Sequence, residues 1–164
     1  MFVDIHTHFN EPGVAEALGI DMRNPSGSYR TLPSVRMAEF GQFDKQIDVN
    51  EKAGIDKRLM SSPFGAEMFS AMTDKPSLDV VKASNDSIAT TVARKTDRLW
   101  GMGTANPLDA THIKEAERCM GPLGFKGLLC TTSWHGRYLD NEEAFPFWEW
   151  AQGTKTPIFL HPVR

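Results

Sequence analysis

Two histidines separated by one residue stand near the start of the chain, in the stretch FVDIHTHF at positions 2–9. The apolar residues around them predict an extended strand, in which alternate side chains point to the same face. The Cα atoms of His6 and His8 are then roughly 6 to 7 Å apart, and both imidazoles can reach one metal ion. The spacing predicts a metal site, with a chance pair of histidines in a half-buried strand as the alternative.

A third histidine, His161, closes the strand-like run PIFLH and is followed by Pro162. In a parallel sheet all strands end at one edge, where ligands bind in open sheets and barrels alike. In an eight-stranded barrel the first and fifth strands face each other, so histidines from both can meet at one ion. In an open sheet of order 2-1-3-4-5 the same strands lie three spacings apart, about 14 Å, which makes a shared site difficult.

Other side chains at this edge are candidates for substrate contacts. Trp134 and His135 lie in the loop-like stretch TTSWHGRYLDN, where a role without chemistry is the alternative. The long connection at 9–39 is interpreted as a lid over the carboxyl edge, because loops of this length in compact domains are usually functional. It carries Arg36, which could hold an anionic substrate or stay solvated. His112, in the first turn of a helix, is expected on the surface.

Short apolar runs alternate with helical patterns along the chain. The expected strands are Phe2 to His6, Lys57 to Ser61, Leu99 to Ala105, Gly124 to Thr131 and Pro157 to His161. Apolar stripes at helical spacing predict helices that end at Gly54, begin after Ser77, begin after Asp109 and end at Gly153. This alternation predicts right-handed βαβ units and a parallel sheet. No repeat or linker marks a boundary, so 1–164 is interpreted as a single domain.

One polar residue interrupts the apolar stripe of the second helix. Asn85 is expected to face the core beside Val81 and Ile88, where an unpaired amide would cost about 1 to 3 kcal/mol. We therefore predict a hydrogen-bond partner, with a structural bond between helix and sheet as the first interpretation and a catalytic role as the second. Cys119 and Cys130 are interpreted as reduced core residues, because no CxxC spacing is present.

The composition is that of a globular protein, with 40% hydrophobic residues, 24% charged residues and a formal net charge of −3. No run of lysines or arginines indicates a phosphate-binding surface, so nucleic acid is not expected as a partner. The sequence shows neither a secretion signal nor an apolar stretch near the roughly 20 residues that cross a bilayer. We therefore expect no membrane association and a cytoplasmic location.

The chain also resembles a known family. The opening DIHTHF, the stretch ASNDSIATTVARKTDRLWGMGTANPLD, then GFKGLLCTT and PIFLHP are similar to the amidohydrolase superfamily. Within it they resemble the amidohydrolase-related branch of 2-amino-3-carboxymuconate-6-semialdehyde decarboxylase and related carboxy-lyases and hydrolases. The likeness covers nearly the whole chain apart from the loop at 9–39. It implies an α/β fold of the (β/α)8 TIM-barrel type.

The resemblance also implies a site and a reaction. His6, His8 and His161 match the histidines that bind one divalent metal ion, commonly zinc. An arginine before the second strand is implied to hold a substrate carboxylate, and Arg36 is the nearest candidate. The implied reaction is decarboxylation or hydrolysis of a small carboxylated substrate through a metal-activated water.

A complete barrel needs roughly 250 residues, whereas the chain stops after its fifth predicted strand. We therefore expect an incomplete barrel of about five parallel strands, the N-terminal part of a longer enzyme whose catalytic residues lie beyond Arg164. Exposed strand edges in such a piece predict a homo-oligomer or association with a complementing C-terminal half. The alternatives are a flavodoxin-like binding module without catalysis and a degenerate subunit that binds a partner and no metal.

Overall fold

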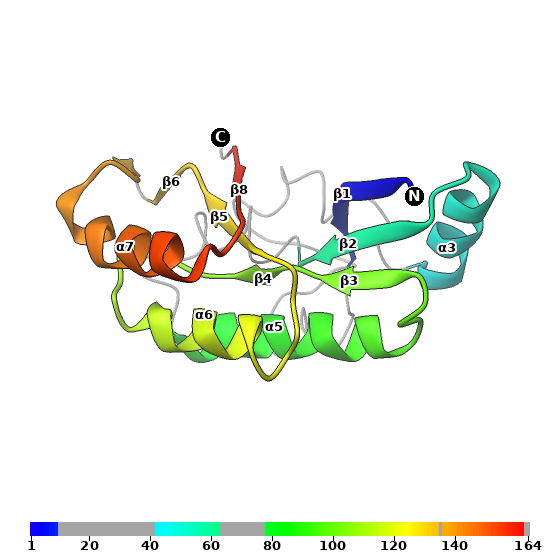
Figure 1. The fold of residues 1–164 in the computed structure, drawn as a ribbon, viewed down its shortest axis with the longest axis horizontal. Coiled ribbons are helices and arrows are strands. Elements are labelled where there is room, and N and C mark those ends of the chain that lie inside the picture. Colours follow the sequence, from blue (N-terminus) through cyan, green and yellow to red (C-terminus); the bar gives the residue numbers. More distant parts are fainter. Residues whose placement is uncertain (10–41, 63–77, 135, 163–164) are drawn as a thin grey trace, which may run out of the picture.

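The computed structural model describes residues 1–9, 42–62, 78–134 and 136–162 (Figure 1). The elements, in chain order, are β1 (Val3–His8), α3 (Phe43–Lys52), β2 (Lys57–Ser61), α5 (Leu78–Ala93), β3 (Leu99–Gly101), β4 (Gly103–Thr104), α6 (His112–Met120), β5 (Leu128–Thr131), β6 (Ser133–Trp134), β7 (Arg137–Tyr138), the 3-10 helix η4 (Glu142–Ala144), α7 (Phe145–Thr154) and β8 (Ile158–His161). All five predicted strands are present, the third of them divided into β3 and β4. Apart from Phe9, the predicted lid at 9–39 lies outside the described residues.

The parallel strands follow one another in chain order, as β1-β2-β3 and then β4-β5-β8. The two halves join at Met102, whose N–H donates to the carbonyl of Met60 on one side at 2.8 Å. The next N–H, of Gly103, donates to Gly127 on the other side at 3.1 Å. This order differs from the flavodoxin-like order 2-1-3-4-5. Among the described strands, β1 and β8 form the two edges of the parallel array.

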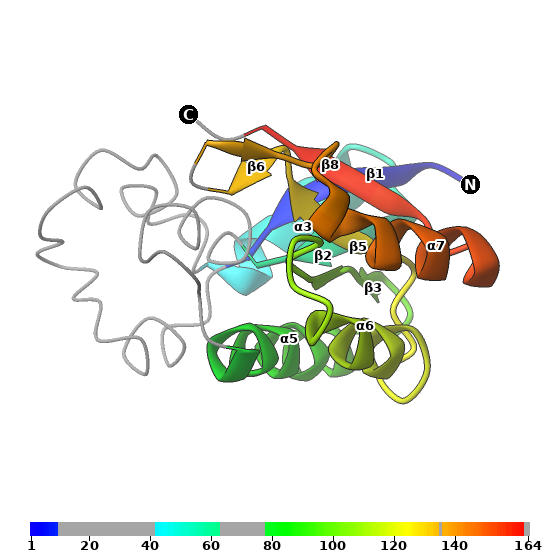
Figure 2. The same cartoon turned by 90° about the vertical axis from the view of Figure 1, so that its left-hand side faces the viewer.

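Helices cover the outer face of this curved sheet. Helices α5 and α6 lie side by side beneath β3 and β4, with α3 beside β2 and α7 at the opposite end (Figures 1 and 2). The main core packs between these helices and the sheet and comprises Ile88, Ala105, Ala116, Cys119, Phe125, Leu128, Cys130 and Phe147. A smaller apolar cluster on the inner face is formed by Met102 and Leu129, with Leu59 and Phe159 packed against it. The sheet is therefore apolar on both faces, as expected for parallel strands.

Two strand glycines let the helical layer approach the sheet closely. A Cβ atom at Gly101 would lie 2.3 Å from the ring of Phe125, and one at Gly103 would lie 2.7 Å from Cys119 Sγ. No larger side chain fits at either position without displacing these neighbours. Cys119 and Cys130 are free thiols in the core, as predicted.

One predicted helix end is confirmed and one is wrong. Gly54 has φ +72°, and Ile55 N–H donates back to the carbonyl of Asn50, which closes α3 with the left-handed turn expected. Helix α7 continues past Gly153, and Lys155 takes the left-handed conformation with φ 56°. The later stop is stabilised by the N–H of Thr156, which donates to the carbonyl of Ala151 at 2.9 Å.

Asn85 joins helix α5 to the sheet, as predicted. Its Oδ1 accepts from the N–H of Thr104 at 2.8 Å, and its Nδ2 donates to the carbonyl of Thr104 at 3.2 Å. Nδ2 also donates to Glu115 on α6 at 2.8 Å. The backbone N–H and C=O of Thr104 point away from β5. The Asn85 side chain therefore gives them the hydrogen bonds that a neighbouring strand would otherwise provide.

Glu115 is a buried carboxylate that Arg118 and Asn85 stabilise. Burial alone would raise its pKa, but hydrogen bonds from Arg118 and Asn85 outweigh that effect and lower it. Arg118 forms a two-pronged pair with this carboxylate, at 2.8 Å from Nε and 2.8 Å from Nη2. The same guanidinium bonds Asp86 on α5 at 2.7 Å, so the network ties the two helices together.

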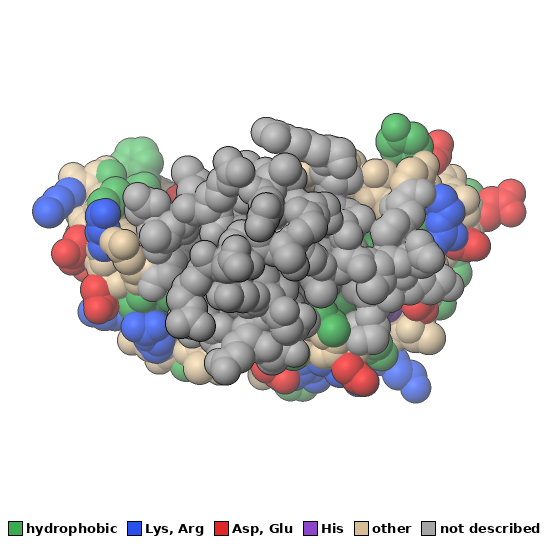
Figure 3. Space-filling model, turned by 180° about the vertical axis from the view of Figure 1, so that it is seen from behind, with side chains coloured by type: hydrophobic (Ala, Val, Ile, Leu, Met, Phe, Trp, Pro, Cys, Tyr) green, Lys and Arg blue, Asp and Glu red, His purple; other side chains and the backbone are tan. Residues whose placement is uncertain are grey.

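The surface shown in Figure 3 carries lysines and arginines interspersed with acidic side chains around the described part of the molecule. No helix among the described residues has both the length and the apolar character needed to cross a bilayer.

The Asn85 network predicts a measurable cost on truncation. We expect Asn85→Ala to lower the free energy of unfolding by about 2 to 4 kcal/mol, because both backbone groups of Thr104 and one oxygen of Glu115 lose a buried partner. Urea unfolding followed by circular dichroism measures the change. Lys82→Ala, at an exposed position of the same helix, is the control and should change stability by less than about 0.5 kcal/mol. A loss for Asn85→Ala as small as that of the control would contradict the structural role.

Candidate metal centre

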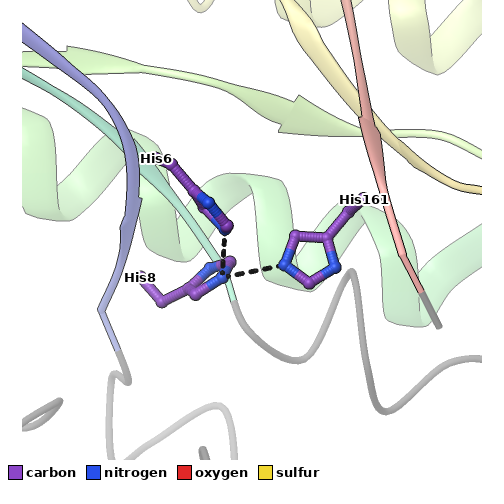
Figure 4. A group of neighbouring side chains, drawn as sticks. All are labelled: His6, His8 and His161. Carbon is purple, nitrogen blue, oxygen red and sulfur yellow. Dashed lines mark hydrogen bonds between the residues drawn. The ribbon is translucent and has the colours of Figure 1, made fainter. Parts of the chain in front are cut away.

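The three histidines predicted as metal ligands lie together between the two edge strands (Figure 4). His6 and His8 extend from β1 and His161 from the end of β8, and the rings point toward one another. The Nε2 atoms of His6 and His8 are 3.1 Å apart, and those of His8 and His161 are 3.3 Å apart. One ring nitrogen from each residue lies within 4.8 Å of the others. The fold thus brings side chains from opposite ends of the chain into one cluster.

Hydrogen bonds on the far side of two rings determine their tautomers. Nδ1 of His161 lies 2.9 Å from the carbonyl of Pro162, which can only accept, so this nitrogen carries the proton. The Ser61 hydroxyl donates to the carbonyl of Thr7 at 3.0 Å, and its oxygen lies 3.0 Å from Nδ1 of His8. With its proton used in this way, Ser61 accepts from Nδ1–H of His8. Both Nε2 atoms are therefore unprotonated and face the cluster.

This arrangement has a direct electrostatic consequence. Two nitrogen lone pairs that face each other at 3.3 Å repel unless a cation lies between them. Two nitrogens bound to one zinc ion at about 2.05 Å, in tetrahedral geometry, stand about 3.3 Å apart, close to both separations in the cluster. The three imidazoles therefore fit a single divalent ion.

The surroundings keep His8 in the form that binds metal. Burial lowers its pKa, and the neighbouring rings of His161 and then His6 lower it further, from 6.5 to about 3. A metal ion requires the neutral imidazole. At neutral pH, His8 can bind a cation without first releasing a proton.

Phe159 forms an apolar wall beside the histidines. Its ring centroid lies 5.0 Å from that of His6, and it precedes His161 by two residues on β8, so both point to the inner face. Met102 and Leu129 are buried in the inner-face cluster against which Phe159 packs. Apolar surroundings strengthen the electrostatic interactions of the polar groups they enclose.

The predicted substrate contacts are only partly described. Trp134 is 1% exposed and packs with Val81 and Leu108 in a core cluster, so its ring serves packing in this structure. Arg36 and His135 lie outside the described residues. The roles of all three toward a substrate stay predictions.

The expected surface position of His112 is wrong. The side chain is 1% exposed, and its Nδ1 accepts from the N–H of Asn106, in the loop after β4, at 3.3 Å. This loop is folded tightly against the helix start, because Asn106 Oδ1 accepts from Leu108 and the carbonyl of Asp109 accepts from the N–H of His112. His112 therefore stabilises the entry into α6 from within the core.

Two residues of the site, Ser61 and Phe159, were not predicted from the sequence. Ser61 ends the strand that pairs with β1, and its register partner is His8. A polar residue at the end of a strand was visible in the sequence, but the pairing that aligns it with His8 was not. Phe159 could have been found, since the alternation that aligns His6 with His8 also aligns it with His161.

Comparison with known proteins identifies the family. The profile of the amidohydrolase family matches residues 3–163. The chain is 26% identical to 2-amino-3-carboxymuconate-6-semialdehyde decarboxylase of Dictyostelium discoideum, over 98% of this chain and 48% of the relative. It is 29% identical to a gamma-resorcylate decarboxylase of Polaromonas sp., over 79% of this chain and 42% of the relative. The chain belongs to the amidohydrolase family and spans about half the length of these curated relatives.

A solved structure gives the fold. The crystal structure of a 5-carboxyvanillate decarboxylase from Novosphingobium aromaticivorans matches with a TM-score of 0.76 at 23% identity, over 99% of this chain and 51% of that one. The predicted fold class is confirmed: the chain forms part of an amidohydrolase TIM barrel. That decarboxylase contains bound manganese, whereas zinc in this chain stays a prediction.

The bond between Ser61 and His8 predicts an effect on metal affinity. We expect Ser61→Ala to weaken Zn2+ binding about 10-fold, because the His8 ring loses the acceptor that selects its tautomer and orientation. Competition with a chromogenic chelator measures the affinity, after circular dichroism has shown that the variant is folded. Ser87→Ala, on helix α5 away from the cluster, should bind as the unmodified chain does. Equal affinities for the two variants would show that Ser61 does not orient the ligand.

Proposed function

We propose that this chain carries the metal-binding half of a decarboxylase that acts on a small carboxylated substrate, with His6, His8 and His161 holding one divalent ion. The observation that supports it is the convergence of three ring nitrogens within 4.8 Å of one another, with Nε2 of His8 and His161 3.3 Å apart. Both curated relatives named above are decarboxylases, which supports carbon–carbon bond cleavage over hydrolysis.

The chain's own residues would hold and orient the parts of this reaction. A divalent ion, when bound, would supply Lewis acidity that polarises a substrate oxygen. His8, neutral and held by Ser61, and His161, held by its bond to Pro162, would bind that ion without rearrangement. In decarboxylation the bond to the carboxylate carbon breaks, CO2 leaves, and the remaining carbon takes a proton. We expect the proton donor to come from outside the described residues.

The substrate we propose is an aromatic carboxylate. Two of the matched proteins are named for such compounds, gamma-resorcylate and 5-carboxyvanillate. Arg36 and His135 are the predicted contacts for its carboxylate. Trp134 is buried in the core, and we propose that it supports the loop that follows it.

Zinc is the ion that we propose for the site. Imidazole nitrogen suits Zn2+, and nitrogen sites bind Zn2+ more tightly than Mn2+. The manganese of 5-carboxyvanillate decarboxylase makes Mn2+ the competing choice. The two ions differ enough in affinity for a direct test.

Metal analysis tests the site itself. We expect one Zn2+ per chain by mass spectrometry of the purified protein, and tighter binding of Zn2+ than of Mn2+. His6→Ala and His161→Ala should each weaken zinc binding more than about 100-fold, since loss of a ligand exceeds the effect of losing a supporting residue. His112→Asn, a histidine outside the cluster, is the control once its fold has been verified. Unchanged zinc content in both ligand variants would remove the shared site.

The non-catalytic alternatives are less well supported. A flavodoxin-like module requires a strand order that differs from the one observed. A degenerate subunit without metal would have no use for three converging imidazoles, two of which are fixed by outer hydrogen bonds. The metal analysis therefore also separates the enzyme from a degenerate subunit.

Exposed apolar side chains on the edge strands indicate how the chain would be completed. Ile5 on β1 is 56% exposed and Leu160 on β8 is 53% exposed. Large apolar side chains on strands that form the edges of the described sheet favour association. We propose that a second copy or a complementing C-terminal half covers them.

Turnover should follow this association. We expect CO2 release from gamma-resorcylate or 5-carboxyvanillate when the zinc-loaded chain is combined with a complementing C-terminal half, in the associated fractions from size-exclusion chromatography. His161→Ala should abolish it at equal protein concentration. A fully active monomer would contradict the need for a partner. Hydrolysis products in place of CO2 from a wider panel of carboxylates would contradict decarboxylation.

A further inference from the structure

Strand β1 does not run in regular register along β2. Asp4 pairs with Arg58 and Thr7 pairs with Met60, so two residues of β1 stand opposite one residue of β2. This two-against-one pairing is a β-bulge, and bulges next to functional sites re-aim side chains. The irregularity comprises Ile5 and His6, so it contains the first histidine of the metal centre.

The bulge changes the side of the sheet that Asp4 occupies. In a regular strand Asp4, His6 and His8 would share one face, and a carboxylate would stand beside the two imidazoles. In the structure Asp4 lies with Thr7 instead, whose hydroxyl donates to Asp4 Oδ2 at 2.8 Å. The carboxylate has turned away from the histidines.

The face of the sheet that carries Asp4 lies beneath helix α3, as the contacts of the paired strand β2 show. Arg58 Nε lies 3.5 Å from Asp4 Oδ2, and Arg58 Nη1 donates to Gln46 Oε1 on α3 at 3.0 Å. Met60, which shares this face of β2, packs with Phe43 of the same helix. Asp4 is thus part of the outer layer, while His6 and His8 reach the inner face.

Asp4 also binds the backbone of the bulge itself. Its Oδ1 accepts from the N–H of His6 at 3.1 Å. A residue inside a bulge is left out of the regular ladder, so this side-chain bond replaces the strand pairing. The Asp4 carboxylate therefore contacts three groups: the N–H of His6, the hydroxyl of Thr7 and the guanidinium of Arg58, its register partner on β2.

We propose that Asp4 is a positioning residue of the metal centre, which holds the bulge that aims His6 at the ion and keeps a carboxylate out of the ligand set. The inference rests on the metal site proposed above. Its action passes through His6, because His8 is held independently by its register partner Ser61.

Cobalt binding to the full chain tests this role. Co2+ alone is titrated into the metal-free protein, and its visible absorption bands report both affinity and ligand geometry. Asp4→Ala should weaken Co2+ binding about 10-fold and alter the bands, while Asp4→Asn, whose amide oxygen can still accept from His6, should restore affinity to within about threefold. Asp56→Ala is the matched control, since Asp56 also accepts a backbone N–H next to β1, that of Phe2 at 2.7 Å, but lies outside the bulge.

A double-mutant cycle separates positioning from general stability. In a His6→Ala background, Asp4→Ala should cause no further loss of Co2+ affinity, because the ligand that it positions is already absent. Equal losses in both backgrounds, or an Asp4→Ala variant that binds as the unmodified chain does, would overturn the proposal. If Asp4→Ala does not fold, Thr7→Val decides instead: about threefold weaker binding supports the proposal and unchanged binding overturns it. An unmodified chain that takes up no Co2+ would overturn both this inference and the metal site.

Discussion

The site depends on one constraint: two strands at opposite edges of the sheet must present unprotonated ring nitrogens to each other. His8 and His161 do so across 3.3 Å. Strands β1 and β8 are separated by four strand spacings along the sheet, about 19 Å if the sheet were flat. Only a sheet that curves through its full width can close that distance. The histidine cluster is therefore a property of the curved sheet and could not form on either half of it alone.

Several features of the fold maintain this curvature. The third strand changes partners at Met102, so the sheet turns between its two halves instead of extending flat. Asn85 satisfies the backbone that this change leaves unpaired, and it anchors α5 at the same point. Gly101 and Gly103 allow the helical layer to pack closely behind the bend. Bending the sheet would otherwise leave polar backbone groups buried without partners.

The ligands are then held from behind, by groups that do not touch the site. Ser61 and the carbonyl of Pro162 select the tautomers of His8 and His161, and Asp4 holds the main chain of His6. Such outer contacts reduce the rearrangement that metal binding requires. The closeness of the three histidine rings, their tautomers and the burial of His8 together favour a cation between them. The family relationship and the local chemistry agree on this point.

The sequence by itself determined the local features, because alternation, helical spacing and chain-order packing depend on neighbours a few residues apart. The strands, the inward pairing of His6 with His8 and the need of Asn85 for a partner all followed from such patterns. Tertiary structure alone decided how close His161 comes, which nitrogens are unprotonated and where Asp4 points. These depend on sheet curvature and on a register shift against β2, which are set by residues more than fifty positions away. A pattern of alternate residues cannot reveal a bulge, since its extra residue reverses the alternation without leaving a local mark.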